Sequence, residues 1–301
     1  MMPRGRKDEA MTPVRTGDVP GDLRTRIAAP IAATADLSDR AGLGLALRRG
    51  TAWLGSDVAV EEDRVRRLSE LAPVLAEPVG RQGRRVEYRM LNGVREAADT
   101  NLRDLALRYE LTVMGGRPIG SEAAKTFGHV HVRPPGAAFG YPEVVEVVHG
   151  EAGFLVQDLR QGPDGPLSTM AWLVRARPGD WVILPPELAH TTIDLGAGPL
   201  VFSDVIDRRA AGIYAGVAKA AGFAWQVRRD GRLVRNPHYA DVPRLIEIDA
   251  ADWSGPAAGV LYRIFRQDPG AFAWLSDPAM FPVVAPALWE RVRDAIGTPG
   301  A

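Results

Sequence analysis

Two histidines stand two positions apart in a segment with the composition of a β-strand. The sequence has five histidines, and His129 and His131 directly follow Gly128. Alternate side chains of a strand point to the same face, so we expect the two imidazoles to be aimed together. Imidazoles placed side by side can bind one metal cation. A single pair of histidines in a strand is more often a surface or packing feature, so the hypothesis of a metal site needs further ligands.

Two later motifs supply those ligands. Glu143 begins the next strand-like segment after a loop at 133–142, and a hairpin there would place its carboxylate opposite the histidine pair. A third histidine follows the Pro185-Pro186 pair, which fixes a turn and re-aims the strand after it. The sequence therefore predicts one divalent metal ion, bound by His129, His131, Glu143 and His190.

The ligand types limit the metal without selecting it. Three imidazoles and one carboxylate suit iron(II), manganese, nickel or zinc, and the ligand types alone do not choose among them. The chain has no cysteine, which excludes a thiolate site, a cysteine nucleophile and a disulfide framework. The remaining histidines, His149 and His238, stand beside turn residues and are expected in exposed loops.

The elements that must position these ligands are short strands. From Val86 to Ile206 the sequence alternates strand-like segments with Gly/Pro turns, and no long helical segment intervenes to build a parallel sheet. This pattern indicates an all-β sandwich or barrel, with a jelly roll as the natural candidate. The predicted strands are VEYRM, LALRYELTVM, GHVHV, EVVEVV, GFLVQDL, AWLVRA, WVIL and LVFSDVI.

Segments outside this region are interpreted as extensions. Residues 1–60 form an N-terminal arm, disordered from Met1 to about Pro20, and residues 241–301 form a helical C-terminal extension packed on the barrel domain at 61–240. Apolar spacing predicts one amphipathic helix at 60–75, a short helix at 213–221 and another at 287–296. The segment AWQVRRDGRLVRN is expected to form a hairpin turning at Asp230-Gly231.

Composition favours a small molecule as the partner. The chain has 301 residues and is 46% hydrophobic, with 37 Lys plus Arg and 37 Asp plus Glu. The resulting zero formal charge gives no global field toward nucleic acid or an anionic membrane. We find no apolar run of transmembrane length and no secretory signal core, so a cytoplasmic location is the expectation.

The motifs together resemble the cupin-type glucose-6-phosphate isomerases, best known from archaea. The similarity runs in order from Val65 to Tyr239. It is carried by VRRLSEL, VEYRM, LTVMGGRPIGSEAAKTFGHVH, PPELAHTTIDLGAGPLVF and YAGVAKAAGFAWQVRRDGRLVRNPHY. The resemblance implies a cupin double-stranded β-helix (a jelly-roll barrel) with helical N- and C-terminal extensions. It also implies one divalent metal ion per subunit and a homodimer.

The resemblance also assigns roles to residues. His129, His131, Glu143 and His190 match the family's metal ligands, and Glu143 and His190 would also serve catalysis. The other matched positions line the sugar-phosphate site, where hydroxyl and backbone N–H groups can donate to phosphate oxygens. These substrate-binding positions are Tyr88, Thr112, Thr126, Gly128, Phe202 and Tyr214. Phe202 could equally belong to the barrel core.

Four features depart from the family pattern. Val145 and Ile206 stand where the family carries tyrosines, and Gly212 stands in place of a histidine. The loop between His131 and Glu143 is longer than the family's usual spacing. If the missing groups assist ring opening or proton movement, activity would be reduced or redirected to a related sugar phosphate, and phosphate binding would suffer less than chemistry.

The implied activity is the interconversion of glucose 6-phosphate and fructose 6-phosphate, in glycolysis and gluconeogenesis. A metal ion on the carbonyl and hydroxyl oxygens would act as a Lewis acid. Two routes remain open: Glu143 moves a proton through a cis-enediol as general base, or a hydride passes directly between the carbons. Alternatives are a cupin acting on another sugar phosphate, a cupin dioxygenase, and a non-catalytic sugar-phosphate-binding cupin.

Overall fold

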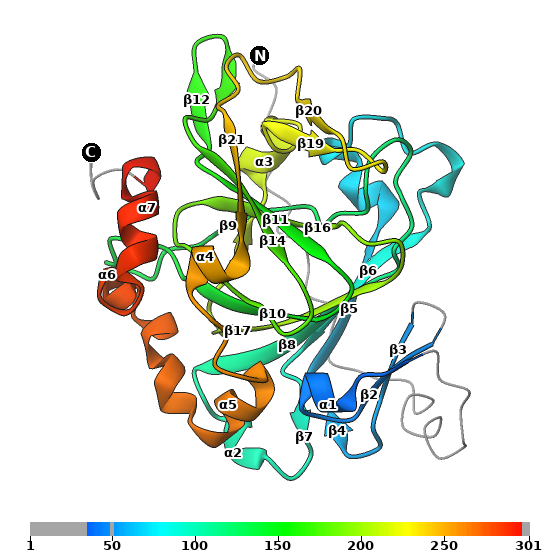
Figure 1. Cartoon of the computed structure of the whole chain (residues 1–301), viewed down its shortest axis with the longest axis vertical. Helices are drawn as coiled ribbons and strands as arrows, with labels where there is room; N and C mark the ends of the chain where they lie inside the picture. The colour runs from blue at the N-terminus through cyan, green and yellow to red at the C-terminus, as the bar shows by residue number, and fades with distance from the viewer. Residues whose placement is uncertain (1–34, 49–50, 297–301) are drawn as a thin grey trace, which may run out of the picture.

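The computed structural model describes residues 35–48 and 51–296, and its centre is a pair of β-sheets (Figure 1). The disorder expected at Met1–Pro20 lies outside the described residues. One sheet has six strands in the order β15-β10-β17-β8-β6-β5, and the other has four in the order β16-β11-β14-β21. Neighbouring strands are antiparallel, except that β14 and β21 pair in parallel. The all-β core expected from the sequence is therefore present.

The strands of the six-stranded sheet are β15 (Trp181–Leu184), β10 (Glu143–His149), β17 (Leu200–Asp207), β8 (Leu107–Met114), β6 (Val86–Asn92) and β5 (Glu62–Arg67). Those of the four-stranded sheet are β16 (Ala189–Asp194), β11 (Ala152–Gln157), β14 (Ala171–Ala176) and β21 (Leu245–Asp249). Small two-stranded pairs are β4 (Val58–Ala59) with β7 (Arg95–Glu96), β9 (Val130–His131) with β18 (Gly212–Ile213), β12 (Arg160–Gly162) with β13 (Gly165–Leu167), and β19 (Trp225–Val227) with β20 (Leu233–Arg235). The last pair confirms the hairpin predicted at Asp230-Gly231.

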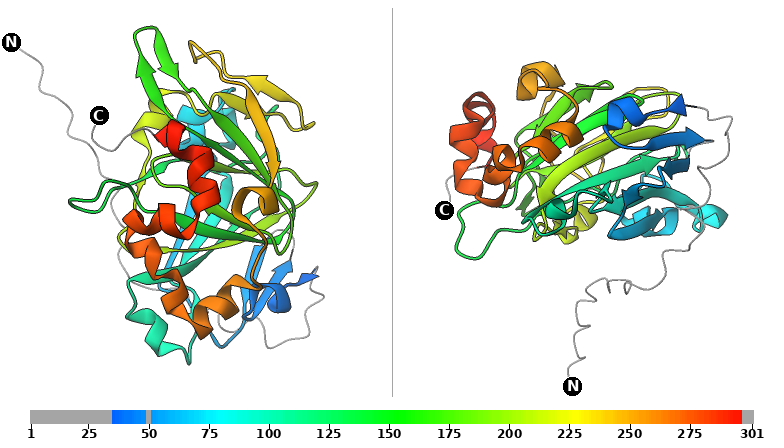
Figure 2. Two further views of the ribbon diagram at one scale, coloured as in Figure 1. Left: turned by 60° about the vertical axis from the view of Figure 1, so that its left-hand side comes forward. Right: turned by 90° about the horizontal axis from the view of Figure 1, so that it is seen from below.

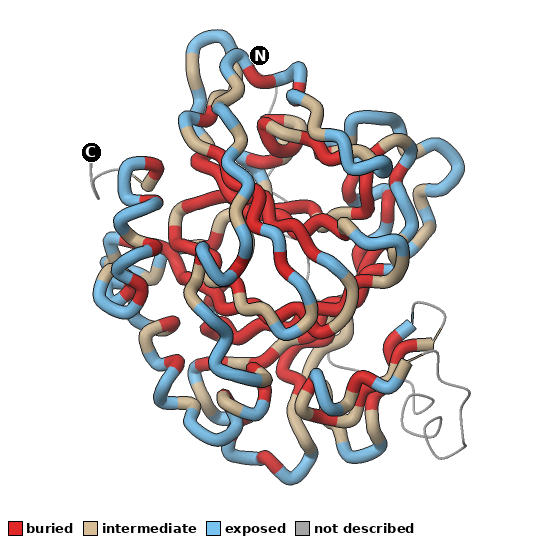
Figure 3. The backbone as a smooth tube through the Cα atoms, viewed as in Figure 1, coloured by how far each residue is buried: buried red, intermediate tan, exposed pale blue. Residues whose placement is uncertain are grey.

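Each sheet turns one face toward the other. Phe154 of β11 and Phe202 of β17 meet edge to face between the sheets, with ring centroids 6.3 Å apart. Alternation along β8 then sends Thr112 and Met114 to this inner face, while Leu111 and Val113 pack on the outer face of the sheet. Both faces of the six-stranded sheet are thus buried, as the red core in Figure 3 shows.

A three-stranded sheet covers part of the outer face. It consists of β1 (Ala35–Asp36), β2 (Leu45–Arg48) and β3 (Thr51–Leu54), with the short helix α1 (Ser38–Ala41) between β1 and β2. The expectation of a helical N-terminal extension is therefore wrong for the described residues. Leu45 and Leu47 alternate with the less buried Ala46 and Arg48 and face the apolar cluster on the outer side of the main sheet, which is the period of a strand.

The helix predicted at 60–75 is also wrong. Glu62–Arg67 is strand β5, and the 3₁₀-helix η1 (Leu68–Val74) follows it. Pairing with β6 satisfies the backbone of β5, and it leaves Val65 41% exposed while Arg66 is buried. The apolar positions Leu68, Leu71 and Val74 recur every third residue, which fits a 3₁₀ turn as well as an α-helix.

Most of the C-terminal segment is helical and runs along one side of the molecule (Figure 2). It follows β21, so a strand of the four-stranded sheet lies beyond residue 240. The helix predicted at 287–296 is confirmed by α7 (Pro286–Ile296). Among residues 35–48 and 51–296, no helix is long and apolar enough to cross a membrane. The helices are α2 (Thr100–Arg103), α3 (Ala215–Lys219), α4 (Ala250–Ser254), α5 (Leu261–Gln267), α6 (Phe281–Val284) and α7 (Pro286–Ile296), and the remaining 3₁₀-helices are η2 (Gly80–Gln82), η3 (Pro269–Ser276) and η4 (Pro278–Met280).

A buried carboxyl group joins this segment to the sheet. The backbone N–H of Leu261 donates to Glu146 Oε2 at 2.8 Å, and Glu146 is 2% exposed on the outer face of β10. Burial raises the pKa of Glu146 from its ordinary 4.5 to about 7, against the opposing effect of that hydrogen bond.

We expect Glu146→Gln to flatten the pH dependence of stability. The folded state holds the Glu146 proton up to about pH 7, whereas the unfolded chain releases it near 4.5. The free energy of unfolding of the wild type should therefore fall, relative to the variant, as pH rises through this window and then level off. Urea titrations at a series of pH values measure the difference, and parallel curves for the two proteins would contradict the raised pKa of Glu146.

Candidate metal centre

Three histidine side chains converge between the two sheets. His129 and His190 form a β-bridge in which the backbone N–H of each donates to the other's carbonyl oxygen at 3.0 Å. His129 Nε2 lies 2.9 Å from His131 Nε2, which confirms that the two imidazoles are aimed together. One ring nitrogen from each of the three histidines lies within 4.8 Å of the others. The three histidines that the sequence predicted as ligands are thus brought together.

The carboxylate of Glu143 completes the group. Its Oε2 lies 3.5 Å from His131 Nε2 and 3.8 Å from His190 Nε2. As predicted, Glu143 is the first residue of β10, but the predicted hairpin is wrong, because β10 pairs with β15 and β17 while β9 pairs with β18. The loop after His131 therefore leads the chain from β9 into the six-stranded sheet.

Backbone carbonyls orient two of the rings. His131 Nδ1 lies 2.9 Å from the carbonyl oxygen of Tyr141, and His190 Nδ1 lies 3.4 Å from that of Leu188. With protons on both Nδ1 atoms, the Nε2 atoms present lone pairs to the centre of the group. His190 Nε2 is buried and has no hydrogen-bond partner in the described ranges. A buried, unsatisfied nitrogen aimed at two other imidazoles and a carboxylate fits a metal ion.

Burial sets the protonation of these groups. It lowers the pKa of His131 to about 4 and the pKa values of His129 and His190 well below the ordinary range, and repulsion between the imidazoles adds to the effect at the latter two. Burial, reinforced by the charge of Glu110, raises the pKa of Glu143 to about 8. Neutral imidazoles are the form that binds metals, and a cation would supply the positive charge that the buried carboxylate lacks.

Aromatic residues predicted for the pocket gather on one side of His129. The Tyr214 ring lies 5.4 Å from the His129 ring and 5.3 Å from that of Phe127. The hydroxyl of Tyr88 accepts a hydrogen bond from the Phe127 backbone N–H at 3.3 Å, and burial raises the pKa of Tyr88 to about 12. The structure thus brings Tyr88 and Tyr214 together around Phe127, beside the histidines.

The remaining predicted pocket positions differ in whether their polar groups already form hydrogen bonds within the chain. Thr112 and Phe202 stand directly opposite each other on β8 and β17, on the inner face. Thr126 is engaged with the chain beside His190, since its Oγ1 accepts a hydrogen bond from the Thr192 backbone N–H at 3.0 Å. Thr112 Oγ1 and the backbone N–H of Gly128, in contrast, form no hydrogen bond with any residue the structure describes.

Arg66 belongs to this group and was missed from the sequence. It is 5% exposed, and its guanidinium carbon lies 5.3 Å from the Tyr214 ring centroid and 5.9 Å from that of Phe127. It also forms a side-chain hydrogen bond with Tyr88, and its charge lowers the pKa of His129. The available signal was the Arg66-Arg67 pair in the matched motif. Because a helix was predicted there, the strand that turns Arg66 inward and leaves Arg67 outside was not anticipated.

The departures from the family pattern have structural counterparts. A Cβ atom at Gly212 would lie 2.8 Å from the His129 ring and 2.9 Å from the Tyr214 ring, so those rings occupy the space of a side chain there. Ile206 instead packs in a small buried cluster with Tyr141, which the long loop supplies. Val145 is fully covered on the inner face of β10.

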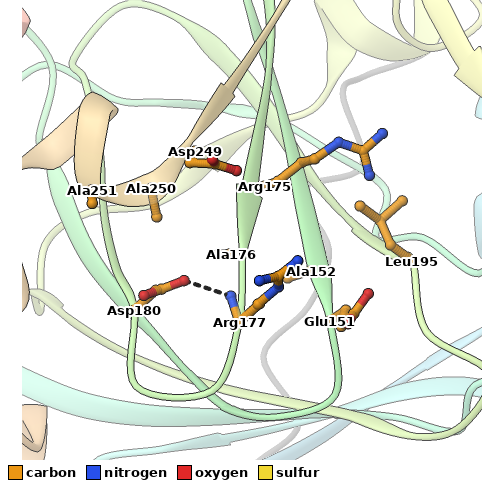
Figure 4. Close-up of a pocket in the computed structure, with 10 residues that line it drawn as sticks. All are labelled: Glu151, Ala152, Arg175, Ala176, Arg177, Asp180, Leu195, Asp249, Ala250 and Ala251. Carbon is orange, nitrogen blue, oxygen red and sulfur yellow. Dashed lines mark hydrogen bonds between the residues drawn. The ribbon is translucent and has the colours of Figure 1, made fainter.

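A hollow of about 320 Å³ lies elsewhere on the surface (Figure 4). It is bordered by charged side chains around the ends of β14 and β21, including Arg175, Asp180 and Asp249. The backbone N–H of Arg177 donates to Asp180 Oδ2 at 2.8 Å across one edge. None of its lining residues belongs to the histidine group, so the chemistry argued above does not use it.

Comparison with known proteins places the chain among aldose–ketose isomerases. The sequence profile of the family Glucose-6-phosphate isomerase (GPI) matches residues 65–244, and the chain belongs to that family. It is 30% identical to a glucose-6-phosphate isomerase of Thermococcus onnurineus over 48% of this chain and 70% of that protein. It is 34% identical to a putative glucose-6-phosphate isomerase 2 of Rhizobium meliloti over 38% of this chain and 50% of that protein.

Solved structures give weaker similarity. A cupin 2 conserved barrel domain protein from Rhodopseudomonas palustris is 14% identical and covers 44% of this chain and 72% of its own, with a TM-score of 0.27. Oxalate decarboxylase from Bacillus subtilis, with Mn(II) centres, is 14% identical and covers 42% of this chain and 28% of its own, also with a TM-score of 0.27.

Gly128 offers a test of the packing at this site. It adopts φ +81°, and a Cβ atom there would lie 2.4 Å from the Phe223 ring. We expect Gly128→Ala to reduce the free energy of unfolding by roughly 1–3 kcal/mol more than Gly136→Ala, because overpacking adds to the backbone cost. Gly136 has a similar φ of +75° with nothing within 4 Å of its Cβ position. Equal losses in chemical denaturation of the two variants would contradict the close approach of Phe223.

Proposed function

We propose that the chain is a metal-dependent glucose-6-phosphate isomerase that interconverts glucose 6-phosphate and fructose 6-phosphate. The observation that carries the proposal is the convergence of three neutral imidazoles and the Glu143 carboxylate, with the buried His190 Nε2 unsatisfied. Family membership supplies the substrate and the reaction. We further propose that the two facing sheets form the cupin double-stranded β-helix.

The metal ligands in this proposal are His129, His131, Glu143 and His190. A bound divalent ion would polarise the carbonyl and hydroxyl oxygens at C1 and C2 of the open-chain sugar as a Lewis acid. We favour iron(II) as the metal. Manganese, nickel and zinc are alternatives, because they also accept nitrogen and oxygen ligands. The carbonyl of Tyr141 holds the His131 ring in its metal-binding tautomer.

Glu143 is the proposed proton carrier. It lies within 4 Å of two of the histidines, and burial disfavours its ionised form, so it can accept a proton from one carbon and return it to the other. A direct hydride transfer is the alternative route. Transfer of label from solvent to the product carbon would distinguish the two, because only the proton route exchanges with water.

The proposed phosphate site lies on the Arg66 side of the histidines. Thr112 Oγ1 and the Gly128 N–H are uncommitted donors, and the Arg66 guanidinium supplies positive charge in a nearly dry environment. Thr126, Tyr88, Phe202 and Tyr214 would complete its walls. Cytoplasmic location, homodimer formation and a role in glycolysis and gluconeogenesis belong to the proposal through the family alone.

Two variants test the metal centre. We expect His190→Ala and Glu143→Ala to lower bound metal and to reduce fructose 6-phosphate turnover by roughly 10²–10⁴-fold, the scale of a lost acid–base group. The readouts are metal content and a coupled assay, on protein stripped with chelator and refilled separately with iron(II), manganese, nickel and zinc. His238→Ala, at an exposed turn, is the control. Equal behaviour of the three variants would defeat the assignment.

A specific observation keeps a second candidate, a non-catalytic sugar-phosphate-binding protein. Val145 and Ile206 present no hydroxyl groups to the inner face, and Gly212 has no room for a side chain. Tight metal binding and stabilisation by sugar phosphate without turnover would favour this function or a different sugar phosphate.

Arg66→Gln tests the phosphate site. We expect KM for fructose 6-phosphate to rise roughly 10- to 100-fold, the scale of a lost charged hydrogen bond, while metal content stays unchanged. Arg67→Gln is the matched control, since Arg67 is the neighbouring arginine and is exposed. Unchanged KM in Arg66→Gln would remove Arg66 from the phosphate site.

A further inference from the structure

A row of polar residues crosses the inner face of the six-stranded sheet next to Glu143. Asp204 of β17 stands directly opposite Val145 of β10 on one side and Glu110 of β8 on the other. Glu110 in turn stands opposite Asn92 of β6. Directly paired residues point to the same face, so Asp204, Glu110 and Asn92 all face the space between the sheets.

Asp204 has no hydrogen-bonding partner of its own in this row. Arg108 forms an ion pair with Glu110 and also attracts Asp204, but burial and the charges of Glu110 and Glu143 raise the pKa of Asp204 well above its ordinary value. Asp204 is 5% exposed, and its carboxylate accepts no hydrogen bond from any residue in the described ranges. A carboxylate buried to this extent ordinarily has a donor, so the missing one points to a ligand.

Asn92 gives an independent indication of the same kind. Its Nδ2 donates to Glu62 Oε2 at 3.0 Å, but its Oδ1 is buried without a partner among the described residues. Asn92 is 6% exposed. The row therefore presents two unsatisfied acceptors, and both require a molecule that donates hydrogen bonds.

A second metal ion does not fit these acceptors. The structure brings no group of three or more potential ligand residues together around Asp204 in the described ranges, and Asp204 is not part of the histidine group. Neutral hydroxyl groups are the remaining class of donor that a sugar provides. They can satisfy a carboxylate without adding charge to a buried site.

The charges at the two ends of the inner face define a direction. Arg66 stands opposite Tyr88 at one end of β6, and Asn92 lies at the other end. Tyr88 and Asn92 are roughly 13 Å apart along β6, because they stand four residues apart at about 3.3 Å each. An anionic phosphate is attracted to the Arg66 end, whereas Glu110, Glu143 and Asp204 gather toward the other end with Arg108 as their counter-charge, so the polyhydroxyl end of a sugar phosphate is directed toward Asp204.

We propose that Asp204 accepts a hydrogen bond from a sugar hydroxyl at the end of the substrate remote from its phosphate, with Asn92 as a second acceptor. Asp204 is then a specificity-determining residue that selects a polyhydroxyl phosphate over phosphate alone. This inference rests on the proposed function, because it takes a sugar phosphate as the ligand.

The test compares Asp204→Ala and Asp204→Asn with the wild type in the metal-loaded enzyme. The probes are sorbitol 6-phosphate, which carries sugar hydroxyl groups, and inorganic phosphate, which carries no carbon-bound hydroxyl groups. We expect the inhibition constant of sorbitol 6-phosphate and KM for fructose 6-phosphate to rise roughly 10- to 100-fold in Asp204→Ala, and less in Asp204→Asn, whose amide oxygen still accepts. Inorganic phosphate binding and metal content should not change.

Glu146→Gln is the matched control. Glu146 is another buried carboxyl of the same sheet, but it faces outward to Leu261, so it should leave binding of both probes unchanged. Burial and two neighbouring carboxyl groups disfavour the charge of Asp204, and Arg108 keeps its ion pair with Glu110, so removal of Asp204 is not expected to destabilise the fold. The comparison therefore measures binding rather than folding.

Three outcomes would overturn the proposal. Asp204→Ala could bind both probes as the wild type does, it could weaken both probes equally, or it could lose metal along with binding. A wild type that binds sorbitol 6-phosphate but has no turnover would instead count against the proposed isomerase function. The comparison of Asp204→Ala with the wild type on that probe would still decide the role of Asp204.

Discussion

The structure depends on the burial of a charged and polar centre between two β-sheets. Moving a carboxylate such as Glu143 out of water costs several kcal/mol unless hydrogen bonds or opposite charge compensate it. The imidazoles beside it are neutral and cannot supply that charge. Burial therefore favours the protonated form of Glu143. A bound cation would instead stabilise its carboxylate, because the backbone carbonyls that orient His131 and His190 aim their free nitrogen atoms toward it.

Both faces of the six-stranded sheet that carries Glu143 are covered. The N-terminal three-stranded sheet and the C-terminal helices pack on its outer face, where Leu261 and Tyr262 are completely buried. The hydroxyl of Tyr262 donates to Asp99 Oδ2 at 2.9 Å and accepts from the Glu96 backbone N–H at 2.7 Å. These extensions therefore fix the strands that carry Glu143 and Asp204, although they contribute no residue to the centre.

Sequence reasoning succeeded where the signal was local. The two-residue spacing of His129 and His131, the start of β10 at Glu143 and the turn at Asp230-Gly231 are each determined by a few neighbouring residues. It failed where a distant partner decides. Residues 62–67 form a strand because β6 is available for pairing, and that pairing turns Arg66 inward. The hairpin expected between β9 and β10 failed for the same reason, since each strand pairs elsewhere.

The inner face also accounts for how an isomerase of this family could tolerate the loss of side chains expected in its pocket. Val145 and Ile206 make part of the wall apolar, but the carboxylate of Asp204 lies in the next strand, directly opposite Val145. A sugar hydroxyl group that would otherwise contact a tyrosine can donate to this carboxylate instead. The protein then offers a hydrogen-bond acceptor where the family pattern offers a donor. In this proposal Arg66 attracts the phosphate and Asp204 accepts a hydrogen bond from the sugar, and the metal centre lies beside the path between them.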